Sequence, residues 1–271
     1  MIRYFTLLLL LCCSLTVFGQ KKEKHSRAYR EYQSSRDEVK ESKYPSFFGL
    51  QFRPIFATNF LTASKLDLKG NELTANYHQL FGYTFGGTIK IGLSKIINLE
   101  TGLNFVQRNY SIDFSIHSAT TNIPDAKTDF RIISYDVPIN ALFYIKLSDK
   151  FYMNASLGAS VAYFPTNVWK RYIISSVEKF EHFGNRFSKF YMEANANVGF
   201  EYRSKKAGSF YIGASIKVPF KPIFQISAVY TAVDHQERLI GNVSGSYLTA
   251  DFRYYFPNFG KRGGVKGPIE Q

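Results

Sequence analysis

Apolar and polar side chains alternate along most of the chain after residue 46. The clearest stretch is 190–203, where Phe190 and Met192 share one face while Glu193 and Glu201 share the other. Successive side chains of a β-strand point to opposite faces, so this stretch predicts a strand with an apolar medium on one side and a polar one on the other.

Eight segments show this alternation, and each is near or above the length that crosses a bilayer at a tilt. They are 48–58, 82–93, 96–107, 133–147, 151–163, 190–203, 209–218 and 248–256. After the first twenty residues, the sequence has no apolar run of the length that a transmembrane helix needs.

The links between these segments alternate in length. Short links at 94–95, 148–150 and 204–208 alternate with long ones at 59–81, 108–130, 164–189 and 219–245. Barrels of bacterial outer membranes have short periplasmic turns and long outward loops. The sequence therefore predicts an all-β fold: an eight-stranded antiparallel up-and-down transmembrane β-barrel with long extracellular loops, in the outer membrane of a Gram-negative bacterium.

The alternative fold is a soluble eight-stranded barrel that carries a ligand, as lipocalins do. Alternation alone allows it, because the apolar stripe could line a ligand cavity instead of facing lipid. Aromatic residues gather near strand ends, for example at Tyr152, Tyr163, Tyr202 and Tyr254, where an interfacial girdle would lie. These aromatics and the long loops favour the membrane barrel.

Composition agrees with strands that are apolar on one face only. Aromatic residues make up 17% of the chain, with 26 Phe and 19 Tyr, yet the mean hydropathy is only −0.18. The formal net charge is +13.

The first 46 residues differ from the rest. Residues 1–19 have a positive start, an apolar stretch and a small residue before a cleavage point, which predicts a secretory signal peptide. Cys12 and Cys13, the two cysteines of the chain, lie inside it, so no disulfide is expected after processing. Residues 20–46 predict a charged periplasmic tether, 47–256 the barrel, and 257–271 a C-terminal tail.

The polar stripe of the predicted barrel carries acids and bases in nearly equal number. If it faces the lumen, the polar network consists of Arg53, Lys90, Glu100, Asp136, Lys146, Glu193, Glu201, Lys217, Asp251 and Arg253. Eight strands leave an interior that side chains can fill, and buried charges must pair. We expect a salt-bridged plug, with a narrow conducting path as the alternative.

Two segments carry a family resemblance. The stretch 133–146 (ISYDVPINALFYIK), with the strand 151–159 (FYMNASLGA), resembles the central hairpin of the PorT-like outer-membrane β-barrel proteins of Bacteroidetes. The ending 247–256 (YLTADFRYYF) resembles the terminal strand that barrel-assembly machinery recognises, although the chain continues to Gln271. The resemblance implies a location in the outer membrane more than a task, because one member of the family is implicated in protein secretion and gliding while most have no assigned activity.

Catalytic chemistry has weak support. The histidines fall one in each long link, at His78, His117, His182 and His235, with a fifth at His25. An acid–base pair would need two of them to converge with a nucleophile, and no two have the spacing of metal ligands. We expect no catalytic residues, no cofactor and no metal.

The third long link mixes basic and aromatic residues, among them Trp169, Lys170, Arg171 and Phe180. It predicts a solvated loop folded over the barrel mouth, or a contact with phosphorylated lipopolysaccharide. The expected partners are outer-membrane lipid, the barrel-assembly machinery and an envelope protein, and not nucleic acid. The expected function is structural or interactive. The alternatives are a small-solute or lipid binder, a narrow channel, or an enzyme acting through the outer loops.

Overall fold

The computed structural model describes residues 46–58, 65–94, 96–118, 122–204 and 207–257. The predicted signal peptide, nearly all of the predicted tether and all but the first residue of the predicted tail lie outside these ranges. The described residues form β-strands joined by turns, and all strand pairs are antiparallel, which confirms the predicted all-β antiparallel class. No described helix is long and apolar enough to span a membrane.

The described residues contain thirteen strands, against the eight expected. They are β1 (Phe47–Phe56), β2 (Lys65–Lys69), β3 (Leu73–Gly92), β4 (Ile97–His117), β5 (Asn122–Lys146), β6 (Phe151–Tyr163), β7 (Val168–Ile173), β8 (Lys179–Arg186), β9 (Phe190–Ser204), β10 (Gly208–Pro219), β11 (Phe224–Thr231), β12 (Gln236–Val243) and β13 (Tyr247–Tyr255).

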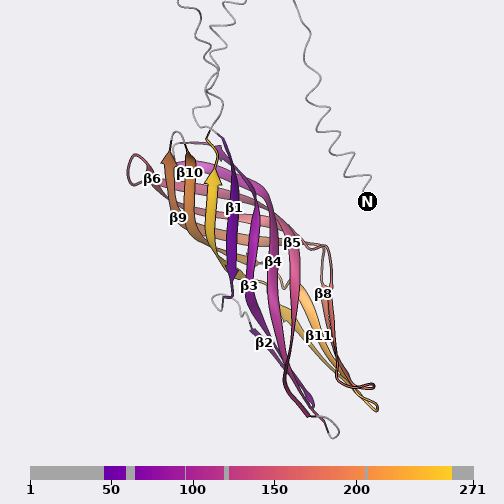
Figure 1. Ribbon diagram of the computed structural model, residues 1–271. Helices are drawn as coiled ribbons and strands as arrows, with labels where there is room; N and C mark the ends of the chain where they lie inside the picture. Colours follow the sequence, from indigo (N-terminus) through magenta and orange to yellow (C-terminus); the bar gives the residue numbers. More distant parts are fainter. Residues whose placement is uncertain (1–45, 59–64, 95, 119–121, 205–206, 258–271) are drawn as a thin grey trace, which may run out of the picture. The chain divides into compact units, whose positions relative to one another are not determined.

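Eight of these strands pair in a closed cycle, which we call the ring. Its order is β1-β13-β10-β9-β6-β5-β4-β3, and β3 pairs back onto β1. The first and last strands are therefore neighbours, with Leu50 opposite Tyr254. Figure 1 shows these strands wound around a common axis.

Tight turns join neighbouring strands at one end of the ring. Ser94 Oγ accepts the backbone N–H of Ile97 at 2.9 Å between β3 and β4, and Ser148 Oγ accepts that of Phe151 at 3.3 Å between β5 and β6. At the start of β10, Gly208 has φ +80°, a conformation that side chains with a Cβ rarely adopt. A Cβ there would lie 2.2 Å from the carbonyl oxygen of Tyr255.

Where the structure describes them, the long links consist mainly of strands rather than loops, which corrects the expectation of long loops. β3, β4 and β5 continue beyond the ring, with β2 paired to β3, and a separate sheet runs in the order β12-β11-β8-β7. We call this part the extension: β2, β7, β8, β11, β12 and residues 73–80, 109–117 and 122–132. Figure 1 shows β2, β8 and β11 at the end of the molecule opposite the tight turns.

A shared apolar core holds the extension together. Phe114 of β4 and Phe180 of β8 stack with ring centroids 4.0 Å apart, and Ile112, Ile226 and Tyr230 are buried in the same cluster. Fully burying side chains of this size contributes about 1.5–3 kcal/mol each. Some apolar residues of the predicted third loop, such as Phe180, therefore belong to the core between two sheets.

A bulge in β3 lies between the two parts. The register with β4 shifts between Leu80 and Tyr83. On the extension side, Ala75 and Tyr77 are buried, whereas on the ring side Thr84 and Thr88 are buried, so the inward face changes from odd to even numbers. One extra residue reverses which face of a strand points inward.

Candidate functional site

The ring encloses charged side chains. Five basic residues and five acidic ones are buried there: Arg53, Lys90, Arg108, Lys217 and Arg253 with Glu100, Asp136, Glu193, Glu201 and Asp251. Isolated charges could not remain ionised in such a setting, because burying each one costs several kcal/mol unless it is paired. The equal numbers of buried acids and bases therefore indicate that charged side chains fill the interior of the ring and pair with one another.

Near the tight turns, the network is built around two glutamates. Glu201 accepts hydrogen bonds from Lys90 Nζ at 2.8 Å, from the Tyr144 hydroxyl at 2.8 Å and from Arg203 Nε at 2.6 Å. The ammonium of Lys90 also lies 4.0 Å from the centroid of the Tyr255 ring. Four strands of the ring are joined in this way through one carboxylate and its partners.

Glu100 is the second of these glutamates. Arg253 donates two hydrogen bonds to it, at 2.9 and 2.7 Å, and the hydroxyl of Tyr255 donates a third at 2.7 Å. Arg253 also donates to Asp251 at 2.7 Å. Paired charges with several hydrogen bonds fix the register of strands that are far apart in sequence.

A second cluster lies where the ring meets the extension. Arg108 donates to Glu193 at 2.7 Å, and Lys217 pairs with Asp136 and lies 3.8 Å from the second carboxylate oxygen of Glu193. The guanidinium of Arg108 is 4.7 Å from the centroid of the Tyr247 ring. Arg108 was missed from sequence, because it was placed in a predicted loop although alternation continues through it.

The structure brings nine of the ten predicted lumen residues into the ring. Arg53 is buried among them, although its Nε and Nη2 atoms have no hydrogen-bond partner within the protein. Lys146 is the exception, which corrects that part of the prediction. It lies at the end of β5, where its exposed ammonium pairs with Asp149 of the adjoining turn at 2.8 Å.

Inward glycines make room for this filling. Gly199 and Gly213 face each other in the register of β9 and β10, and a Cβ on either would lie within 2.4 Å of the hydroxyl of Tyr211. That hydroxyl donates to Asn197 at 2.6 Å, and Asn197 in turn donates to Asp251 at 2.9 Å. A larger side chain at either glycine would displace Tyr211 from the network.

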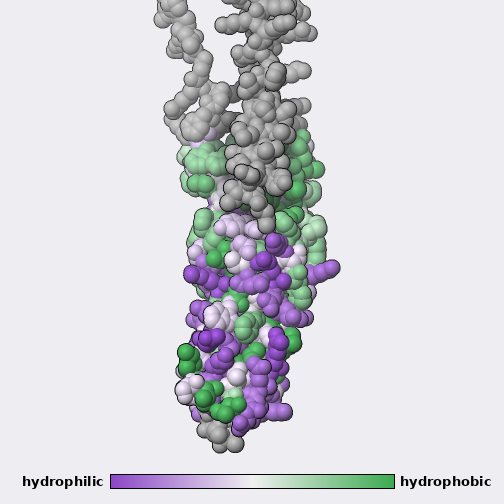
Figure 2. Space-filling model, turned by 90° about the vertical axis from the view of Figure 1, so that its right-hand side faces the viewer, coloured by the Kyte–Doolittle hydropathy of each residue, from purple (hydrophilic) through white to green (hydrophobic). Residues whose placement is uncertain are grey.

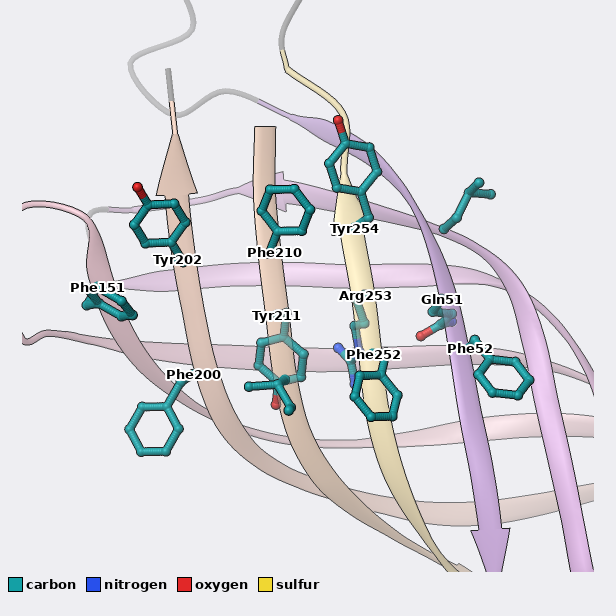
Figure 3. Close-up of a pocket in the computed structure, with 12 residues that line it drawn as sticks. Gln51, Phe52, Phe151, Phe200, Tyr202, Phe210, Tyr211, Phe252, Arg253 and Tyr254 are labelled. Atoms are coloured by element: carbon teal, nitrogen blue, oxygen red, sulfur yellow. The ribbon is translucent and has the colours of Figure 1, made fainter. Parts of the chain in front are cut away.

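The outer wall of the ring is apolar. A hollow of about 560 Å³ lies on this wall. Figure 3 shows rings such as Phe200, Phe210 and Phe252 around it, and these residues are about half exposed. Figure 2 shows that hydrophobic residues gather on the ring and that hydrophilic ones are more frequent toward the extension. The hollow has the chemistry of a surface in contact with hydrocarbon.

Aromatic rings form a row at each rim of this wall. Near the turns, the row passes through Phe151, Tyr202, Phe210, Tyr254, Phe256 and Phe48, with neighbouring centroids such as Phe210 and Tyr254 5.0 Å apart. At the extension side, another row includes Phe56, Phe81, Tyr83, Phe85, Phe105, Tyr135, Tyr163 and Phe190. Two such rows are typical of the interfaces that flank a membrane-spanning apolar band.

The four described histidines lie in separate pairs. His182 is buried, with Nδ1 3.0 Å from the hydroxyl of Tyr77, and burial lowers its pKa to about 3. His235 lies 2.5 Å from Glu72, and His117 lies 2.7 Å from Asn122. Within the described residues, no three His, Cys, Asp or Glu side chains gather as a metal site would require.

The carboxylate beside His182 pairs with other residues. Glu181 binds Arg171 at 2.8 Å and Lys179 at 3.0 Å. Burial raises its pKa, but these two cations outweigh that effect and hold the pKa below its usual value. Glu181 and His182 occupy opposite faces of β8, so the neighbours in sequence do not form an acid–base pair.

One serine lies beside a histidine–aspartate pair. His78 Nε2 is 3.2 Å from Asp113, and Ser111 stands opposite His78 in the register of β3 and β4. Ser111 Oγ is buried and has no hydrogen-bond partner. An activated serine needs a hydrogen bond to its base, and the described residues show none between Ser111 and His78.

No protein-family model and no curated protein matches the chain. Among solved structures, it is similar to the outer membrane protein OprG from Pseudomonas aeruginosa, with a TM-score of 0.46 and 13% identity, over 79% of this chain and 96% of that one. It is also similar to the beta domain of the Bordetella autotransporter BrkA, with a TM-score of 0.17 and 9% identity, over 78% and 99%. Because both TM-scores lie below 0.5, the fold rests on the strand pairings.

Proposed function

We propose that this chain is an outer-membrane protein whose ring spans the bilayer, whose interior is a plug and whose extension projects outside as a non-enzymatic interaction module. The observation that carries the proposal is that polar and apolar side chains are placed in opposite ways in the two parts of the molecule. The ring is apolar outside and charged inside, whereas the extension has an apolar core. Only a strand structure in contact with lipid benefits from such an arrangement.

The height of the apolar wall supports this location. On β9, Phe190 belongs to one aromatic row and Tyr202 to the other, twelve positions apart. At about 3.3 Å per residue, this spans about 40 Å along the strand. The usual strand tilt of about 45° reduces it to about 30 Å, the thickness of a hydrocarbon core.

Membrane fractionation with a heat-shift gel tests the location. We expect the protein in the outer-membrane fraction and a change in its migration on boiling, because closed barrels resist detergent until they are heated. A protein that is soluble after osmotic shock and migrates identically with and without boiling would contradict the proposal.

We further propose that the ring does not conduct. The paired charges fill an interior that, in an eight-stranded barrel, is wide enough only for side chains. In planar bilayers we expect a baseline without single-channel steps. Stable steps would favour the alternative of a narrow channel.

The extension supplies the proposed interaction surface. β7 is the last strand of the second sheet and lies next to β5, and its Trp169, Tyr172 and Ile173 side chains are exposed beside the basic Lys170 and Arg171. Exposed aromatic and arginine side chains are typical of protein–protein interfaces. We propose that an envelope protein binds here, in line with the resemblance to the PorT-like proteins of Bacteroidetes and a role beside a secretion or surface machine.

Crosslinking in intact cells tests this surface. A photoreactive residue at Trp169 is expected to give a defined crosslinked product, and the same residue at Lys127, exposed on β5, serves as the matched control. A product at Lys127 but none at Trp169 would contradict the assignment of β7.

We also propose that outer-leaflet lipid, including lipopolysaccharide, meets the protein where the ring joins the extension. A hollow of about 700 Å³ lies there between Phe187, Phe190, Met192 and Phe220, with Lys221 at its edge. Apolar rings beside a lysine suit acyl chains that end in a phosphorylated head group. Loss of co-purified lipid phosphate in a Lys221→Glu variant would support this contact.

A further inference from the structure

A second hollow, of about 600 Å³, lies on the outside of the molecule where the extension begins. On β4 it follows directly after Phe105 of the aromatic row, and on β5 its Arg131 lies four positions before Tyr135 of the same row. Lys170 of β7 contributes a side chain from the other sheet, because β5 and β7 lie side by side. Five of the eight described residues that line the hollow are polar, so it does not suit an acyl chain.

A chain of hydrogen bonds orients two carboxamides in this hollow. The backbone carbonyl of Phe81 can only accept, so Asn109 presents Nδ2 to it, at 2.8 Å. The Oδ1 of Asn109 then accepts from Nε2 of Gln107 at 3.0 Å, and Oε1 of Gln107 accepts from the hydroxyl of Tyr83 at 3.2 Å. Both carboxamide oxygens are therefore occupied, whereas each carboxamide nitrogen keeps a second N–H with no partner among the described residues.

Two cations line the same hollow. Arg131 and Lys170 are exposed, and neither forms an ion pair or a hydrogen bond with another described residue. Arg171, the neighbour of Lys170 in sequence, is by contrast paired with Glu181 at 2.8 Å. Asp129 is the one acid of the described lining. The hollow thus offers positive charge and N–H donors, which suit an anion with several acceptor oxygens.

Phosphate is such an anion, because it carries about −1.5 to −2 charges at pH 7 and three strong acceptor oxygens. The group that bears the phosphate meets both apolar and polar surroundings. Phe81 is 59% exposed, and its ring rests edge-on against Phe56 with centroids 5.7 Å apart. Asp129 can accept a hydrogen bond from a hydroxyl group. A sugar ring has an apolar C–H face and hydroxyl groups, so it fits this combination.

We propose that this hollow binds a phosphorylated sugar, with the phosphate held by Arg131 and Lys170 and the sugar ring against Phe81. The site is separate from the hollow beside Lys221. Two sources offer this chemistry: the head group of an outer-leaflet glycolipid, or a free sugar phosphate. The glycolipid source rests on the proposed membrane location of the ring, whereas the site itself does not.

Ligand-observed NMR on the folded full chain in nonionic detergent micelles tests the site. Glucose 6-phosphate is the probe, because it is too polar to enter the micelle, and glucose is its uncharged counterpart. We expect saturable binding of glucose 6-phosphate and about tenfold weaker binding of glucose, which lacks the group that pairs with the two cations. Equal binding of the two probes, or no saturable signal from glucose 6-phosphate, would overturn the proposal.

Charge variants locate the binding. Arg131→Gln and Lys170→Gln are each expected to weaken glucose 6-phosphate binding about fivefold, because each removes one charge-assisted contact at an exposed position. Lys127→Gln removes an equal charge four positions before Arg131 on the same face of β5, outside the described lining, and should leave the affinity unchanged. Equal affinities of Arg131→Gln and Lys127→Gln would overturn the assignment.

Asn109→Asp tests the carboxamides. The new side chain keeps the size of asparagine, but it has no N–H to donate and it adds a negative charge. We expect glucose 6-phosphate binding to fall by about tenfold or more. An unchanged affinity would overturn the role of the carboxamides as donors to the ligand. A heat-shift gel on each variant separates a lost site from a lost fold.

Lipid nanodiscs identify the source of the ligand. In discs of phosphatidylcholine, glucose 6-phosphate should bind as it does in micelles. If discs that also contain diphosphorylated lipid A abolish this binding, and dephosphorylated lipid A does not, the natural occupant is the lipid head group. If binding persists with both, the occupant is a free sugar phosphate. A failed fractionation test would refute the membrane location alone, and the micelle experiment would still decide on the site.

Discussion

β4 runs through both parts of the molecule and presents the same face inward throughout. In the ring, that face carries Glu100 and Asn104, and in the extension it carries Ile112 and Phe114. The outward face changes in the opposite sense, from the exposed Leu103 to the polar Asp113. One strand thus has a polar inside in one half and an apolar inside in the other.

The proposed membrane location attributes this difference to the surroundings of the strand rather than to the strand itself. Water around the extension would favour burial of apolar groups at about 25 cal/mol per Å². Lipid around the ring would remove that driving force and leave the interior to be held by charge pairs and hydrogen bonds. Four predictions test this contrast.

The largest effect is expected in the charged interior. Glu201→Gln removes the charge that faces Lys90, whose ammonium is almost fully buried, and should lower the free energy of unfolding by about 4 kcal/mol, the usual cost of leaving a buried charge unpaired. Urea titration in lipid vesicles measures it. The double variant with Lys90→Met should recover at least half of the loss, and no recovery would show that the pair does not act as a unit.

The apolar wall should respond next. Leu157→Lys places a charge on the outer face of β6, where Leu157 is 65% exposed, and should cost about 2–4 kcal/mol if that face meets lipid. The matched change Ile173→Lys, at 71% exposure on β7, should stay within about 0.5 kcal/mol because that face meets water. If urea titration gave the same loss of unfolding free energy for both variants, the outer faces of the ring and of the extension would not differ in their surroundings.

Acid should weaken the extension through His182. Its pKa is lowered in the folded state to about 3, from an ordinary value near 6.5. The unfolded chain therefore takes up the proton first, and stability falls as the pH drops from about 6.5 toward 3. The slope is up to about 1.4 kcal/mol per pH unit, or about 2 kcal/mol between pH 6 and 4.

Hydrogen exchange of β8 amides at several pH values measures this acid sensitivity. His182→Gln should flatten the pH dependence, whereas His117→Gln, at an exposed position at the end of β4, should leave it unchanged. An unchanged slope in His182→Gln would assign the acid sensitivity to other groups.

The smallest effect is expected at Lys146, the predicted lumen residue that lies outside. Its partner Asp149 is exposed in the adjoining turn, and solvent screens such pairs. Lys146→Met should give the same urea midpoint as the unchanged protein. A loss comparable to that of Glu201→Gln would mean that Lys146 reaches the interior after all.

The sequence predicts the ring well because its alternation is regular. Residues such as Asp136, Glu193 and Glu201 fall on the polar stripe of long segments with a constant phase, so their inward position follows from period two alone. Lys146 shares the phase of Asp136, but it lies at the strand end, where the turn takes the side chain into solvent. The phase of the alternation predicts which face of the strand a residue occupies. It does not predict whether the residue lies within the ring or at its solvent-exposed end.

The extension was missed for physical reasons. Alternation does continue from Arg108 through Ile116, but the buried arginine resembles the end of a strand. β7 is exposed on both faces and has no period to detect. The core of the extension depends on Phe114, Phe180 and Tyr230, which meet only because two sheets pack together. No local pattern in the sequence reports such a meeting.

The bulge between Leu80 and Tyr83 also limits how the gene for this protein can change in length. β4 keeps one phase from end to end, so it tolerates insertions of two residues but not of one. β3 has already absorbed a single residue, and removal of Phe81 would turn Tyr77 and Ala75 outward while Thr84 stays inside. Variants that still fold should therefore differ in the length of β4 by an even number of residues. In β3 they should keep the one extra residue between Leu80 and Tyr83.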